Sequence, residues 1–68
     1  MYDLEISLST SAVPTILRLS AVFDREAMVA AMAVADFAIV LTGMSATVRI
    51  IRNGAVTAEV LRPIRGGV

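Results

Sequence analysis

The sequence contains no cysteine, no histidine and no lysine. Without cysteine there is no disulfide, and without cysteine and histidine the ligands of structural zinc and of most transition-metal sites are missing. Nucleophilic catalysis loses its usual bases and its strongest nucleophiles for the same reason. We therefore expect a protein that is not an enzyme and that holds neither a cofactor nor a metal.

The residues that remain do not assemble a catalytic motif. The hydroxyl side chains at 9–11 have no activating base nearby and are typical of a polar turn. Asp3 and Glu5 share one face of a predicted strand, but a half-exposed strand does not bury carboxyl groups as catalysis at neutral pH requires. The glycines at 66–67 precede no helix that could bind a phosphate.

The chain is short and rich in apolar residues. At 68 residues it lies near the lower limit of autonomous folding, yet 57% of its residues are hydrophobic, against about 45–50% in an ordinary domain. Small folds recruit disulfides, metals or self-association, and here only self-association remains. We expect a single domain over residues 1–64 that forms a homodimer, with residues 65–68 as a frayed tail.

The longest apolar run, residues 27–41, is interrupted only by Asp36. It is shorter than the about 20 residues that a membrane span needs. The N-terminus is acidic and strand-like, unlike a signal peptide. The sequence therefore predicts a cytoplasmic protein with no membrane partner.

The formal net charge is zero, but the charges are distributed unevenly, and all six cationic residues are arginine. The C-terminal part is basic, and its predicted hairpin carries Arg49, Arg52 and Arg62 as candidate partner-binding residues. Arginine forks suit recognition of carboxylates and phosphates, although GC-rich coding gives the same bias. Zero net charge argues against nucleic acid as the first choice of partner.

Two strands are predicted in the N-terminal part. Residues 2–9 alternate, with Leu4, Ile6 and Leu8 on one face, and Pro14 belongs to the turn at 10–14 that follows. A second strand is expected over 15–23. One face of this strand holds Leu17, Leu19, Ala21 and Phe23. The other face holds Ile16, Arg18, Ser20 and Val22.

A helix is predicted over 25–41, with Asp24 as its N-cap and Gly43 as its C-cap. Composition also permits a strand over 37–42, but no turn residue separates that segment from the helix. The side expected to pack on the sheet holds Ala27, Ala31, Val34, Ala35 and Ala38, flanked by Met28, Ile39 and Leu41. Phe23 and Phe37 are expected in the core.

The opposite side of this helix is unusually apolar. Val29, Ala33 and Val40 lie there, where a helix that covers one face of a lone sheet would normally be polar. Together with Ile16 and Val22, which lie on the half-apolar face of the second strand, they are the predicted self-association residues.

Residues 46–61 form a predicted β-hairpin around Asn53-Gly54. A three-residue loop over 52–54 keeps apolar residues together, with Gly54 left-handed in a bulge. Its pairs are Ile50 with Val56, Val48 with Ala58, and Ala46 with Val60. Pro63 ends the last strand.

The element order predicts an α+β fold of ββαββ type, a four-stranded antiparallel sheet with one helix packed on one face. The functional hypothesis is a small protein–protein interaction module that self-associates. A phage-type or mobile-element accessory protein that inhibits a larger host complex is one placement. A nucleic-acid-binding or antitoxin-like regulator, which would use the arginine-bearing hairpin, is the alternative. A small-ligand domain with its pocket at the dimer interface is a third possibility.

Overall fold

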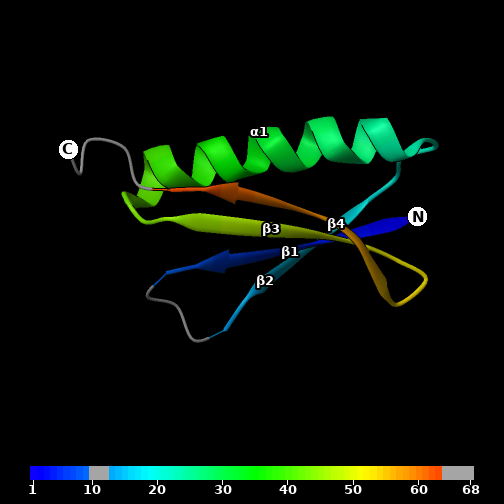
Figure 1. The fold of residues 1–68 in the computed structure, drawn as a ribbon, viewed down its shortest axis with the longest axis horizontal. Coiled ribbons are helices and arrows are strands. Elements are labelled where there is room, and N and C mark those ends of the chain that lie inside the picture. Colours follow the sequence, from blue (N-terminus) through cyan, green and yellow to red (C-terminus); the bar gives the residue numbers. More distant parts are fainter. Residues whose placement is uncertain (10–12, 64–68) are drawn as a thin grey trace.

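The structure, a computed structural model, describes residues 1–9 and 13–63. The elements are β1 (Tyr2–Leu8), β2 (Thr15–Leu19), α1 (Asp24–Thr42), β3 (Ala46–Arg52) and β4 (Ala55–Arg62). They form one antiparallel sheet in the order β2-β1-β3-β4, with α1 on one face (Figure 1). The predicted ββαββ fold is confirmed. The predicted tail at 65–68 and most of the predicted turn at 10–14 lie outside the described residues.

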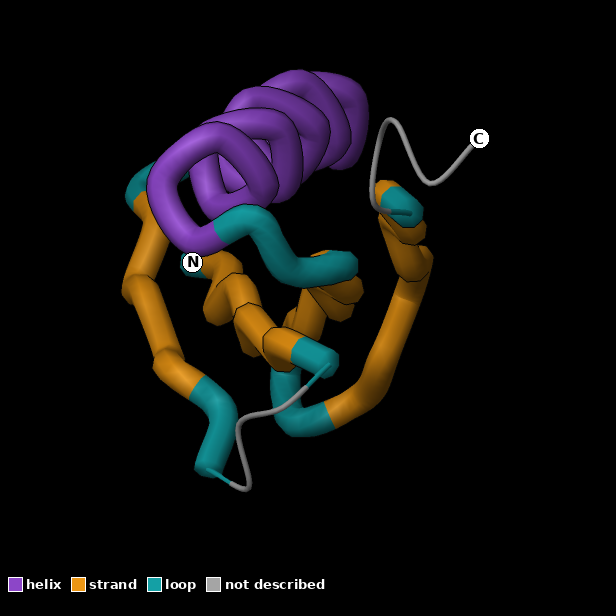
Figure 2. The backbone as a smooth tube through the Cα atoms, turned by 90° about the vertical axis from the view of Figure 1, so that its left-hand side faces the viewer, coloured by secondary structure: helices purple, strands orange, loops and turns teal. Residues whose placement is uncertain are grey.

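The sheet consists of two hairpins joined through their first strands. β1 pairs with β3 along its whole length, so that Leu4 lies opposite Ile50 and Ile6 opposite Val48. This register keeps the apolar residues of both central strands on one face. Seen end-on, the sheet curves beneath α1, and β2 and β4 form its two edges (Figure 2).

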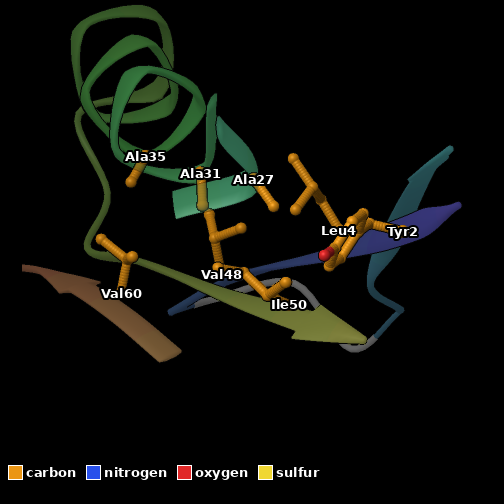
Figure 3. Close-up of a cluster of buried hydrophobic side chains, with 8 residues drawn as sticks. All are labelled: Tyr2, Leu4, Ala27, Ala31, Ala35, Val48, Ile50 and Val60. Atoms are coloured by element: carbon orange, nitrogen blue, oxygen red, sulfur yellow. The ribbon is translucent and has the colours of Figure 1, made fainter. Parts of the chain in front are cut away.

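The core lies between the central strands and one side of the helix (Figure 3). Three alanines at a four-residue spacing face the sheet with no exposed surface: Ala27, Ala31 and Ala35. The strands supply the larger side chains, which are Tyr2, Leu4, Val48, Ile50 and Val60. Because residues four apart lie on one side of a helix, the alanines form a flat strip. This strip of small side chains lets the helix backbone come close to the sheet.

Both helix ends carry recognisable caps. The helix begins at Asp24, and Phe23 takes the N-cap position that the sequence assigned to Asp24. Glu26 Oε1 accepts two hydrogen bonds of 3.0 Å, one from the backbone N–H of Phe23 and one from the backbone N–H of Val22. Gly43 has a φ of 70° and donates its N–H to the carbonyl of Ile39 at 2.8 Å, the predicted C-cap.

Three large side chains predicted to be buried are exposed. Phe23 is 59% exposed because β2 ends at Leu19 rather than at 23, and the chain has left the sheet before the helix starts. The 37–42 segment is helical, as favoured from the sequence. Phe37 and Leu41 are 67% and 77% exposed. Both lie on the flank away from β4, whereas α1 packs mainly over β3 and β4 and less closely over β1.

The turn of the second hairpin is shorter than predicted. Arg52 lies opposite Ala55, which leaves only Asn53 and Gly54 in the loop. Their φ angles are 53° and 79°, the two left-handed residues of a type I′ turn. The three-residue loop predicted from the sequence is therefore wrong.

A bulge in β4 restores the apolar pairing that the shorter turn would otherwise disrupt. The register shifts between Ile50 and Ile51, so that Thr57 has no partner residue, and its hydroxyl donates to the Ile50 carbonyl at 3.2 Å. Beyond the bulge, Ile50 faces Ala58. By the same shift Val48 faces Val60 and Ala46 faces Arg62. The predicted partners were wrong, and Val56, expected inside, is 57% exposed.

Candidate interaction surfaces

Ion pairs cover most of the charged residues of the described chain. The pairs are Arg18–Asp3 at 3.1 Å, Arg49–Glu5 at 2.8 Å, Arg49–Glu59 at 3.0 Å, Arg52–Asp24 at 3.3 Å and Arg62–Asp36 at 2.9 Å. The remaining acid, Glu26, accepts the backbone N–H groups at the helix start. Every carboxylate side chain of the sequence is thus engaged within the chain. The basic C-terminal part does not present a free basic surface.

The three predicted partner-binding arginines are not brought together. Arg49 lies on the sheet face that points away from α1, because its cross-strand partners are Glu5 and Glu59. Arg52 lies at the hairpin end of the sheet, with its guanidinium 5.7 Å from the centre of the Tyr2 ring. Arg62 points to the helix side, where it contacts α1. Each arginine therefore belongs to a different part of the surface.

The outer sheet face, which α1 does not cover, has a charged centre. The register aligns Ile16, Glu5, Arg49 and Glu59 in one row across all four strands. The hydrogen bond from Arg49 to Glu59, followed by the one to Glu5, raises the pKa of the Arg49 guanidinium. Apolar side chains accompany the charges on this face: Ile16, within the row, is 51% exposed, and Val56 and Leu61, beside it, are 57% and 61% exposed.

The outward side of α1 carries a continuous apolar surface. Val29, Ala33 and Val40, predicted from the sequence to mediate self-association, are all exposed, Val29 to 66% and Val40 to 81%. Phe37 and Leu41 extend the same side because they follow Ala33 at intervals of four residues. These five residues are called the outer stripe below.

Sequence reasoning missed two members of the outer stripe and placed two other residues beside it. Phe37 and Leu41 were assigned to the core, although their spacing from Ala33 was a signal that they lie outside. Ile16 and Val22 are exposed as expected. However, Ile16 lies on the outer sheet face and Val22 on the segment between β2 and α1. The five predicted self-association residues therefore do not form one surface.

A groove lies between the C-terminal half of α1 and the end of β4. Its walls are Asp36, Ile39 and Val40 on the helix and Arg62 and Pro63 on the strand side. The Arg62–Asp36 ion pair bridges the two walls. Because Val40 belongs to both and Asp36 lies next to it on the helix, the groove and the outer stripe adjoin one another.

The described residues contain no other candidate site. Across 1–9 and 13–63, no group of histidine, cysteine or acidic side chains is placed to hold a metal ion. In the same ranges the buried side chains are apolar except for the hydroxyl of Tyr2, which donates a hydrogen bond to Asp24. No helix in this part of the chain is long and apolar enough to cross a membrane.

Comparison of the chain with protein families, with curated proteins and with solved structures gave no match. The functional argument therefore depends on the surfaces described above.

Proposed function

We propose that this chain is a non-enzymatic protein–protein interaction module that self-associates as a homodimer through the outer stripe of α1. The observation that carries the proposal is the exposure of Val29, Phe37 and Val40 on the side of the helix that faces away from the sheet. Contiguous exposed apolar surface on a small soluble fold is typical of an interface. A helix with only one buried side would otherwise carry polar residues there.

The outer sheet face supports a second contact, with a larger protein. Its row of ion pairs around Arg49 is accompanied by Ile16, Val56 and Leu61, a mixture of charged and apolar groups that is common at non-obligate interfaces. We propose this face as the surface through which a phage-type accessory protein would bind and inhibit a host complex. Arg49 is then the partner-binding arginine with the most central position.

Binding of nucleic acid is the less supported alternative. Affinity for phosphates comes from arginine and lysine side chains that release counterions when they bind. Four of the five arginines in the described residues already hold a carboxylate, and Arg49 holds two. The hairpin of β3 and β4 therefore offers little free positive charge.

Sedimentation velocity over a range of concentrations tests the proposal, with Val40→Lys and Ile16→Lys as matched variants. Both residues are exposed, and each new lysine would lie near an acid, Asp36 in the helix or Glu5 across the strands. The wild-type chain should dimerise. Val40→Lys should weaken dimerisation by about tenfold or more, since it places a charge in an apolar contact, and Ile16→Lys should not.

Two results would contradict the proposal. A wild-type chain that stays monomeric at its highest soluble concentration would exclude self-association. A dimer that Val40→Lys and Ile16→Lys weaken equally would exclude the outer stripe as its interface.

A further inference from the structure

We infer that the second copy docks edge to edge along β4, so that the two sheets continue into one another and the two α1 helices lie side by side on the same face. This inference rests on the proposed self-association and narrows its contact to the part of the outer stripe nearest β4, which includes Val29, whereas Phe37 and Leu41 lie on the other flank of α1 and stay outside the contact. The dimer axis would stand perpendicular to the sheet beside β4.

The two edges of the sheet are not equally open to pairing. β4 has eight residues, contains neither proline nor lysine, and is paired only with β3. β2 has five residues and follows directly after Pro14. Beyond the bulge at Thr57, the regular part of β4 at residues 58–62 presents a row of backbone N–H and C=O groups that another strand can satisfy. A two-fold axis beside β4 would pair each copy with its own antiparallel equivalent.

The position of α1 favours the same edge. The helix packs mainly over β3 and β4 and less over β1, and it runs along β4 (Figure 1). The ion pair between Asp36 and Arg62 fixes its C-terminal half to the end of β4. Pairing two copies through β4 would therefore bring their helices together, whereas pairing through β2 would leave the helices far apart.

The flank of α1 next to β4 is self-complementary in charge. Arg25, Met32 and Asp36 lie on this flank because they are spaced by seven and four residues. Four of the five arginines that the structure describes pair with a carboxylate, and Arg25 is the fifth. Its guanidinium lies 6.0 Å from the centre of the Phe23 ring. The two-fold axis makes the two α1 helices antiparallel. If it passes between them at residues 30 and 31, Arg25 of each copy faces Asp36 of the other.

The spacing fits this arrangement. Eleven residues separate Arg25 from Asp36, which is about 16 Å along the helix, so the two cross pairs would lie about 8 Å on either side of the axis. Met32 and Val29, 41% and 66% exposed, would meet between them. A carboxylate has lone pairs for more than one guanidinium, so Asp36 can keep Arg62 while it accepts the Arg25 of the second copy.

A charge exchange between two variants tests this geometry. In Arg25→Glu alone, the new glutamate faces Asp36 of the second copy, and in Asp36→Arg alone, the new arginine faces Arg25. Each variant should therefore dimerise about tenfold or more weakly than wild type. An equimolar mixture should form a heterodimer, because both cross pairs then join opposite charges. Arg18→Glu, on the outer sheet face, is the control and should leave dimerisation unchanged.

Hydrogen exchange of the backbone amides tests the strand contact separately. Protection of residues 58–62 should rise with the dimer fraction, while protection of residues 15–19 should not. If the wild-type chain dimerises but the mixed variants do not associate, the helix arrangement is overturned and the proposed function stands. If the mixture associates without added protection of β4, the edge contact is overturned. A monomeric wild type would overturn both.

Discussion

The hydroxyl of Tyr2 donates a hydrogen bond to Oδ1 of Asp24, and this bond joins the start of β1 to the first turn of α1. Arg52, at the end of β3, donates to the same oxygen at 3.3 Å, and its guanidinium lies near the Tyr2 ring. Three elements thus meet at one carboxylate. Asp24 also lies where the helix dipole favours a negative charge. The cluster fixes the helix start above the central strands.

The first prediction concerns the ionisation of Tyr2. Its hydrogen bond to Asp24, with burial as the next cause, raises the pKa of the phenol above 10.0. Tyr2 is the sole tyrosine of the sequence, so a spectrophotometric titration of the folded protein reports it alone. The midpoint should lie above that of free tyrosine, and Asp24→Asn should lower it. A wild-type midpoint at or below 10.0 would contradict the hydrogen bond.

The same cluster predicts a loss of stability in alkali. A group whose pKa is raised by folding stabilises the fold fully below its unfolded pKa, here about 10, and this contribution disappears as the pH rises through the folded pKa. The free energy of unfolding should therefore fall above about pH 10. Tyr2→Phe should remove that part of the pH dependence, measured by urea unfolding at several pH values.

The alanine strip predicts a strong difference between neighbouring helix positions. Ala31 has no exposed surface and faces the sheet, whereas Ala33 is exposed on the outward side. Ala31→Leu should destabilise the fold by about 1–3 kcal/mol because the added atoms push the helix from the sheet. Ala33→Leu should change stability by no more than about 0.5 kcal/mol in dilute solution. Equal effects in denaturant unfolding would contradict the close packing.

The turn of the second hairpin predicts a backbone effect at Gly54. Its φ of 79° is unfavourable for a residue with a side chain, although nothing lies within 4 Å of an added Cβ. Gly54→Ala should therefore cost about 1–2 kcal/mol through the backbone alone. Asn53→Gly, at a φ of 53°, should be tolerated. Thermal unfolding of both variants checks this, and a neutral Gly54→Ala would argue against the type I′ turn.

The bulge predicts that one residue can be deleted from β4. Without Thr57, the two-residue turn leads directly into the pairing of Ile50 with Ala58, so the apolar register is kept. Deletion of Arg49 should abolish cooperative unfolding. β3 pairs with a strand on each side, and a one-residue shift would move the side chains of part of β3 to the opposite face of the sheet. Circular dichroism and thermal unfolding distinguish the two deletion variants. Unfolding of the Thr57 deletion would show that the bulge itself is required.

The hairpin shows where sequence reasoning was sufficient and where it was not. The need to pair apolar residues across β3 and β4 was correctly recognised, but two backbone solutions meet that need. A three-residue loop does so at the turn, and a two-residue turn does so with a bulge at Thr57. Asn53-Gly54 favours the two-residue type I′ turn locally, but that turn keeps the apolar pairing only together with the bulge at Thr57, which the alternation of β3 and β4 did not reveal.

The candidate surfaces show a similar division. Val29, Ala33 and Val40 were predicted to be exposed because helical periodicity places them opposite the alanine strip. The three arginines of the C-terminal part could not be assigned to surfaces in the same way. Their neutralisation by Glu5, Asp24 and Asp36 joins residues that are 26 to 44 positions apart, which no local pattern reveals.

The sequence by itself determined the order of elements, the antiparallel sheet, the limits of the helix within about a residue and the side of the helix that packs, because these follow from local periodicity and caps. Only the tertiary structure decided how far α1 is displaced toward β4. That displacement exposes Phe37 and Leu41 and leaves Arg25 and Asp36 on one open flank. It depends on the sum of the contacts between the helix and the strands of the sheet, so no single segment encodes it.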